Sequence, residues 1–233
     1  MANKNKQGVA ETFDASQSSD AFFSKNKKVI LGSVAALVLI VAGFFLYKSL
    51  VAGPREEKAS TALAKGQEYF NQEQFDKALN GDGAGYVGFA RIADDYSSTD
   101  AGNLANLYVG LCYAHQEKPN WTKALEYVQK FSTSNDQIIS PASQMALGDI
   151  YANNNQNDKA VESFKKAADM ANAKGFEGIN LSVAPLALRK AGIILESEGK
   201  KADALKLYQE IKTKYVTSPM YQDIDKYIER ASN

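Results

Sequence analysis

The chain has 233 residues, with 27 basic and 27 acidic side chains and a single cysteine, Cys112. This length suffices for one sizeable domain with an appendage, and one cysteine excludes an intrachain disulfide. Residues 1–53 hold six lysines against three acidic groups, which leaves 21 basic and 24 acidic groups in the remainder. A mildly acidic body argues against nucleic-acid binding, whereas the basic N-terminal part suits an anionic membrane surface.

The first predicted element is a transmembrane helix. Residues 29–47, VILGSVAALVLIVAGFFLY, form an uncharged run that would span about 28 Å as a helix, close to the hydrocarbon thickness of a bilayer. A cleaved signal peptide usually has a shorter apolar core of about 7–15 residues, and a buried globular helix is the other alternative. We predict an uncleaved anchor over residues 25–52 that crosses the membrane from Val29 to Tyr47.

Flanking charges bear on the orientation of this anchor, but they tie. Three basic residues stand on each side, namely Lys25, Lys27 and Lys28 before the span and Lys48, Arg55 and Lys58 after it. Lys4 and Lys6 tip the count toward an N-terminus inside the cell, and large C-terminal domains translocate largely regardless of charge. We predict a cytoplasmic N-terminus with the body of the protein on the other side.

Two short segments border the anchor. Residues 1–24 are polar and poor in aliphatic side chains, which predicts a disordered tail. Residues 53–58, GPREEK, are predicted to be a linker, because Gly53-Pro54 is typical of a helix break.

The body, residues 59–233, shows helical spacing of apolar residues and an internal repeat. In the clearest copy Gly148 is followed by Tyr151, then by Ala160 and Phe164. The other copies place Gly66, Tyr69 and Ala78; Gly110, Tyr113 and Ala124; and Gly192, Leu195 and Ala204 at corresponding positions. The spacing from glycine to alanine is 12 residues in three copies and 14 in the second. Recurring small residues indicate paired helices whose backbones approach closely.

This pattern resembles the tetratricopeptide repeat (TPR) over residues 59–218. The resemblance implies an all-α fold, in which the N-terminal transmembrane helix is followed by a TPR-like α-solenoid of about four helix pairs and a C-terminal capping helix. The cap is expected from Pro219 to Arg230, with an apolar stripe of Tyr221, Ile224, Tyr227 and Ile228. Ser140-Pro141 and Ser218-Pro219 each predict a helix start with a capping serine, and Pro185 suits the start of the fourth copy.

The first copy contains a literal GxGxxG, Gly83 to Gly88, within GDGAGYVGFA. A dinucleotide site needs this motif between a strand and a helix, and no βαβ pattern is present in the sequence. We interpret the glycines as an insertion that breaks the second helix after Leu79. Residues Asn80 to Gly85 are predicted to be a protruding loop and Tyr86 to Tyr96 the resumed helix, which would return Phe89 and Ile92 to the same face.

The sequence offers little for catalysis or metal binding. Cys112 and His115 form a CxxH, but two ligands do not complete a structural zinc site. His115 is the only histidine, so no nucleophile–base–orienter set can be assembled around an imidazole. We therefore predict no enzyme activity, no cofactor and no metal. Asn120 and Asn180 head triplets that match glycosylation acceptors, which matter only in a eukaryotic secretory setting.

In TPR solenoids the first helix of each pair lines the concave face, and this predicts a partner-binding groove. The alternative is that the same residues pack between helices. The lysine and asparagine clamp of chaperone-binding TPRs is absent. The predicted groove residues are Leu63, Gln67, Phe70, Leu107, Leu111, Met145, Asp149, Arg189, Ile193 and Glu196.

An N-terminal single-pass anchor followed by a TPR domain resembles the YfgM-type ancillary subunit of the bacterial Sec translocon. The resemblance implies protein partners, namely translocon subunits and a membrane-anchored periplasmic chaperone, and a role in handling newly exported proteins. It also implies location in the bacterial inner membrane with the TPR domain periplasmic. Two alternatives stay open: another envelope-assembly scaffold, and an import receptor of the mitochondrial surface with cytosolic TPRs.

Overall fold

A computed structural model describes the backbone of residues 5–233 and the side chains of residues 24–233. The chain forms two units, Met1–Pro54 and Arg55–Asn233. The first unit contains helix α1 (Asn5–Tyr47) and the π-helical turn η1 (Lys48–Ala52). The predicted disordered tail, residues 1–24, is instead helical from Asn5 onward, where its backbone forms the beginning of α1. Among the described residues there is one helix long and apolar enough to cross a membrane, and its apolar window is wholly unburied.

The predicted linker at residues 53–58 is instead helical and belongs to α2 (Gly53–Asn71). Pro54 lies in the first turn of α2, where a missing backbone N–H is tolerated. In the wider π-helical turn before it, the Gly53 N–H donates to the carbonyl of Lys48. Glu56 is also fixed, because its carboxylate accepts bonds from the backbone N–H groups of Asp100 (2.7 Å) and Ala101 (3.0 Å).

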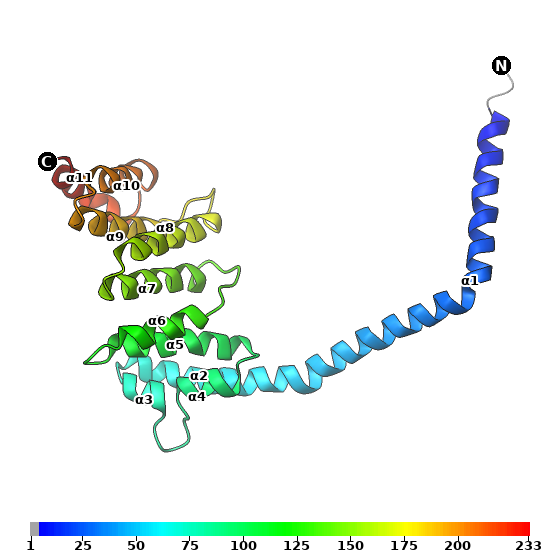
Figure 1. Ribbon diagram of the computed structural model, residues 1–233, viewed down its shortest axis with the longest axis horizontal. Coiled ribbons are helices and arrows are strands. Elements are labelled where there is room, and N and C mark those ends of the chain that lie inside the picture. The colour runs from blue at the N-terminus through cyan, green and yellow to red at the C-terminus, as the bar shows by residue number, and fades with distance from the viewer. Residues whose placement is uncertain (1–4) are drawn as a thin grey trace. The chain divides into compact units, whose positions relative to one another are not determined.

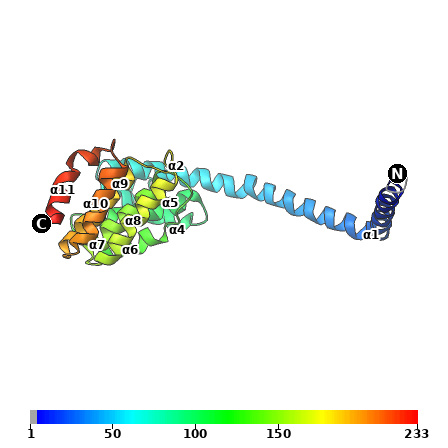
Figure 2. The same ribbon diagram turned by 90° about the horizontal axis from the view of Figure 1, so that it is seen from above.

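The second unit is a stack of antiparallel helix pairs in chain order, closed by short helices (Figures 1 and 2). The predicted all-α, TPR-like solenoid with a capping helix is confirmed. After α2 come α3 (Phe75–Asn80) and α4 (Phe89–Asp95), α5 (Asp100–His115) and α6 (Trp121–Lys130), α7 (Ile139–Asn153) and α8 (Asn157–Ala173), α9 (Val183–Ser197) and α10 (Lys201–Lys214), then the 3-10 helix η2 (Pro219–Asp223) and α11 (Ile224–Ser232).

The repeated glycine is where the two helices of a pair touch. A methyl group built on Gly148 would lie 2.7 Å from the ring of Phe164, and one built on Gly192 would lie 2.4 Å from the ring of Tyr208. Gly110 has the same relation to Val128, at 2.4 Å. These distances are below any real Cβ contact, so the sequence signature of each repeat is a steric requirement of its helix packing.

The glycine-rich insertion breaks the helix as predicted, with one correction. The helix ends at Asn80, but it resumes at Phe89 rather than at Tyr86. The backbone explains this later start. Gly88, the N-cap of α4, has a φ of +90°, and a Cβ built on it would lie only 2.4 Å from the carbonyl oxygen of Leu79. Phe89 is nonetheless fully buried and packs over Gly66, so the predicted register of the first repeat is confirmed.

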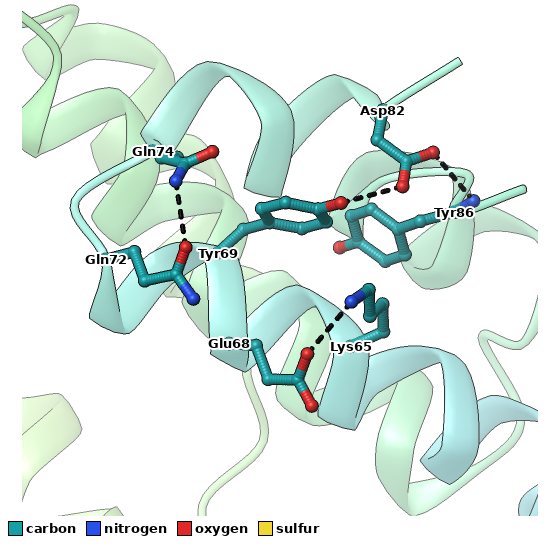
Figure 3. A network of polar contacts seen from close by, with 7 residues as sticks. All are labelled: Lys65, Glu68, Tyr69, Gln72, Gln74, Asp82 and Tyr86. Atoms are coloured by element: carbon teal, nitrogen blue, oxygen red, sulfur yellow. Dashed lines mark hydrogen bonds and ion pairs between the residues drawn. The ribbon is translucent and has the colours of Figure 1, made fainter. Parts of the chain in front are cut away.

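Asp82 organises the protruding loop from within (Figure 3). One carboxylate oxygen accepts bonds from the backbone N–H groups of Ala84 (2.8 Å) and Tyr86 (3.0 Å), and the other accepts from the hydroxyl of Tyr69 (2.8 Å). The Tyr86 hydroxyl donates to the carbonyl of Ala78 at 2.8 Å. Asp82 therefore takes the position an anion would need, and the motif is a closed turn rather than a phosphate cradle.

Neither predicted capping serine makes a side-chain cap bond, although Ser218 stands at the N-cap position of η2 as predicted. Ser140 lies inside the first turn of α7, and the cap is Asp136, whose carboxylate accepts from the backbone N–H groups of Ile138, Ile139 and Ser140. Ser218 precedes η2 but makes no side-chain cap bond, and its hydroxyl is buried without a partner. Ser140 is not the cap because α7 already begins at Ile139, and the carboxylate of Asp136, four residues before Ser140, accepts from the first free N–H groups.

Both potential glycosylation acceptors are helix caps. The side-chain oxygen of Asn120 accepts from the backbone N–H of Lys123 at 3.0 Å. The side-chain oxygen of Asn180 accepts from Ser182, Val183 and Ala184 at 3.0, 2.7 and 3.4 Å. Asn180 stands five residues before Pro185, the spacing that separates Asp136 from Pro141, so the two helix starts share one design.

Candidate partner-binding surface

Two of the predicted groove residues are core residues. Leu63 and Leu107 are each only 6% exposed and pack between helices, so neither presents a side chain to a partner. Phe70 also packs internally, with its ring 5.3 Å from that of Phe75 and 5.2 Å from that of Tyr108. At these positions the structure favours the alternative in which the residues pack between helices.

Three polar residues of the predicted groove, Gln67, Asp149 and Glu196, are engaged across the solenoid. Each binds a group on another helix, in a bond that links one first helix to the next or to the capping helix. These bonds are Gln67 to Tyr108 at 2.9 Å, Asp149 to Lys190 at 2.6 and 2.8 Å, and Glu196 to both Nε and Nη2 of Arg230 at 2.6 Å. These polar side chains therefore link consecutive repeats by hydrogen bonds and ion pairs.

Three residues of the predicted groove lie at the C-terminal repeats. Met145 packs partly buried against the core, and Ile193 is 41% exposed. The Arg189 guanidinium lies 5.8 Å from the ring centroid of Tyr227 on α11, and its Nε is buried without a hydrogen-bond partner. Ile193 is thus the accessible apolar side chain among these three.

The electrostatics of α11 centre on Glu196. Its hydrogen bonds from Arg230 and from the Tyr208 hydroxyl (2.8 Å) hold the pKa of this carboxyl below its usual value, against the opposing effect of burial. Burial, and next the hydrogen bond to Glu196, raise the pKa of Tyr208. Glu196 is only 10% exposed, so this charged contact seals the closing helix onto the last repeat.

A cavity of about 240 Å³ lies between α5, α6 and α7, and two predicted groove residues, Leu111 and Asp149, line it. Sequence reasoning missed Trp121, which also lines it and is the only tryptophan of the chain. Its signal was present, since a lone tryptophan directly after a helix-capping Asn120 lies at a helix start. We call this site the Trp121 pocket; its other lining residues are Ala114, His115, Ala146, Ile150 and Asn153.

The Trp121 pocket has the mixed character of a peptide-binding site. The indole ring and Leu111 provide apolar surface, and the Asp149 carboxylate and the Asn153 amide provide polar groups at the rim. His115 is fixed by a stacked contact with Phe75, with 5.4 Å between ring centroids. A more open hollow of about 950 Å³ lies at the turns of the first two repeats, and its lining is largely charged and polar.

The two residues of the CxxH motif do not form a reactive site. Cys112 is fully buried, and burial raises the pKa of its thiol to about 12, which keeps it protonated and unreactive at neutral pH. Among the side chains from residue 24 onward, no group of three or more histidine, cysteine, aspartate or glutamate residues is placed to hold a metal ion.

Comparison with known proteins places the fold. Residues 116–220 match the model of the Suppressor of spindle checkpoint defect 1 C-terminal domain family. No curated protein matches. Among solved structures, the chain is similar to a Podosopora anserina putative kinesin light chain with nearly identical TPR-like repeats, at 14% identity and a TM-score of 0.56, over 76% of this chain and 85% of that one. It is also similar to MamA protein, at 15% identity and a TM-score of 0.51, over 75% and 90%.

These likenesses establish a TPR-like repeat fold. Folds of this kind are generally non-enzymatic scaffolds that bind other proteins. The match with the spindle-checkpoint family model begins at Gln116, at the end of α5, and ends within η2. It therefore spans the helices from α6 to α10.

Proposed function

We propose that the protein is a membrane-tethered TPR scaffold that binds other proteins through the concave side of its solenoid. The observation that carries the proposal is the Trp121 pocket, an apolar hollow with polar groups at its rim on a TPR-like solenoid, in a chain that also has a candidate membrane span. Elsewhere along the predicted groove most side chains are buried or engaged with one another, with Ile193 an exposed exception, and the pocket is the hollow that these residues leave open.

The finer form of the proposal follows from the sequence resemblance. The anchor would hold the N-terminus in the cytoplasm and the TPR domain in the periplasm of a bacterial inner membrane. There the scaffold would associate with the Sec translocon and a membrane-anchored periplasmic chaperone, and would assist newly exported proteins. Support comes from the order of a basic N-terminal segment, an apolar helix and a TPR-like solenoid.

Site-specific photocrosslinking in native membranes tests both forms. A photoreactive residue at Asn153, which is exposed at the pocket rim, should crosslink to partner proteins identified by mass spectrometry. The matched control is the same residue at Val87, which is exposed at 49% on the insertion loop. Recovery of translocon subunits from position 153 alone supports the finer form. Recovery of other envelope or mitochondrial import proteins would replace it.

Variants separate binding from folding. Leu111→Glu places a charge in the pocket and should abolish the crosslinks while the protein stays helical. Leu107→Glu buries a charge in the core and should unfold the repeat instead. Val87→Glu should leave both the crosslinks and the helicity unchanged. Unaltered crosslinking by Leu111→Glu would show that the pocket is not the binding site.

A further inference from the structure

One edge of the solenoid is defined by a row of hydrogen bonds between the segments that connect the repeats. We call it the loop edge; in Figure 1 the connections from α4 to α5, α6 to α7 and α8 to α9 lie on this side of the stack. The bonds are Glu56 to the backbone of Asp100 and Ala101, Asn103 to the backbone of Ser132 in both directions at 2.8 Å, Gln137 to the carbonyl of Lys174 at 3.2 Å, and Asn172 to the hydroxyl of Tyr215 at 2.7 Å.

The loop edge carries most of the exposed apolar side chains of the second unit. Seven large apolar residues are exposed among residues 55–233, and five of them lie in or beside its loops. The five are Ile138 (71% exposed), Ile139, Phe176 (86%), Leu181 and Val216. The opposite edge carries turns such as Asn154–Gln156 and Glu198–Lys200, where the side chains are polar. Folding leaves this apolar surface uncovered, and such patches mark interaction sites.

The most exposed of these side chains sits on a fixed turn. Phe176 is paired with Ile179 in an isolated antiparallel bridge, in which the Ile179 N–H donates to the Phe176 carbonyl at 3.0 Å. The side chain of Asn172 accepts from the backbone N–H of Asn180 at 3.0 Å, and Asn180 caps α9. The turn is therefore held at its base while its ring points outward, which is the arrangement of a wedge rather than a groove.

The candidate membrane span is close in the sequence to one end of the loop edge. Glu56, which opens the row of hydrogen bonds, follows Tyr47, the end of the span predicted from the sequence, by nine residues. Nine residues extend at most about 30 Å, so the loop edge begins within that distance of the membrane surface. A short tether also raises the local concentration of the two surfaces to about the millimolar range, so a weak contact suffices.

We propose that the loop edge lies on the phospholipid surface, with Phe176 and Ile138 inserted at the interface. The proposal rests on the membrane tether of the proposed function. Aromatic rings favour the headgroup region, and single apolar side chains on fixed loops need no shaped partner there.

Lipid quenching of a single tryptophan tests this contact in the full chain. The reporter is Phe176→Trp in a Trp121→Phe background, reconstituted in nanodiscs of phosphatidylcholine and phosphatidylglycerol with acyl chains either plain or brominated. The matched control is Glu117→Trp in the same background, because Glu117 is exposed in the polar turn after α5. We expect brominated lipid to lower the reporter emission about twofold, the effect of insertion at the acyl boundary, and to leave the control unchanged.

Each other outcome overturns the proposal and says why. Equal emission of the reporter in plain and brominated lipid, with the chain incorporated in the discs, refutes the contact while leaving the tether intact. Failure of the chain to incorporate refutes the tether, and with it the contact. An emission that depends on protein concentration rather than on bromine assigns the patch to a second copy of the chain. Circular dichroism of both variants verifies that the solenoid is folded.

Discussion

The closest helix contact in the fourth repeat gives a direct test of the repeat register. Gly192 on α9 faces Tyr208 on α10, and an added methyl group would lie 2.4 Å from Cε1 and 2.7 Å from Cζ of that ring. Tyr208 cannot easily retreat, because it is fully buried and its hydroxyl binds Glu196, which is held in turn by Arg230. The substitution Gly192→Ala must therefore shift a packed ring or separate two helices.

The expected cost is a difference of two terms. Overpacking a well-packed core costs about 1–3 kcal/mol, and a rigid, hydrogen-bonded ring at this distance belongs at the upper end. Alanine gains about 1 kcal/mol over glycine in a helix interior, which offsets part of that cost. We expect Gly192→Ala to lower the free energy of unfolding by about 1–2 kcal/mol. For a domain of this size the melting temperature should fall by about 2–8 °C.

A double-mutant cycle distinguishes this steric mechanism from a general effect of the substitution. Urea unfolding followed by circular dichroism measures the free energy of unfolding of the full chain in detergent, with Gly192→Ala made alone and in a Tyr208→Leu background. Leucine is shorter and more flexible, so in that background the alanine should be neutral or stabilising by up to about 1 kcal/mol. An equal loss of stability in both backgrounds would refute the reasoning.

Three further predictions follow from the caps, the charges and the insertion. Asn180→Ala should lower the free energy of unfolding by about 1–2 kcal/mol and Asn180→Asp should not, because aspartate keeps the capping oxygen. The pKa of Glu196 is lower in the folded state than in the unfolded state, so its contribution to stability is present above the ordinary carboxyl pKa. That contribution is lost as the pH falls through the folded-state pKa. Both Glu196→Gln and Arg230→Ala should therefore flatten the acid side of a plot of melting temperature against pH. Phe89→Ala should cost about 3–5 kcal/mol in urea unfolding, whereas Val87→Ala, at an exposed position of the adjoining loop, should cost under about 0.5 kcal/mol. Similar losses would contradict the register of the first repeat.

The features that sequence reasoning predicted well are those fixed by sterics. The glycine at each helix contact and the insertion before Phe89 follow from spacing, because helix geometry leaves few ways to place them. The features it missed depend on which of several competing groups wins. Asp136 rather than Ser140 acts as the cap because its carboxylate accepts from the first N–H groups of α7, including that of Ser140 itself, and no spacing rule ranks the two residues.

The candidate site was predicted only in part, for a similar reason. Sequence spacing places Leu107 and Leu111 on one helix, one turn apart, but it does not say how far the neighbouring repeat turns over them. The packing of the neighbouring helices buries Leu107 and leaves Leu111 at the Trp121 pocket. Trp121 itself comes from the second helix of its pair, so a search restricted to first helices could not find it.

The length of the repeats connects the two surfaces proposed for this protein. Successive contact glycines, from Gly66 to Gly192, are 44, 38 and 44 residues apart, against about 34 in the usual TPR. Part of the excess is the Asp82 loop, and part lies in the connections that form the loop edge. Extra residues in surface loops cost little in closure entropy, so their presence alone needs no function. Their composition is the informative part, since a tolerated loop is expected to be polar, whereas these connections hold Ile138 and Phe176 outward on turns fixed by hydrogen bonds. A membrane contact at the loop edge would hold the solenoid in one orientation on its tether and limit the directions in which the Trp121 pocket can face. The tether and the loop edge together would then hold a partner bound in the pocket at a set height above the bilayer.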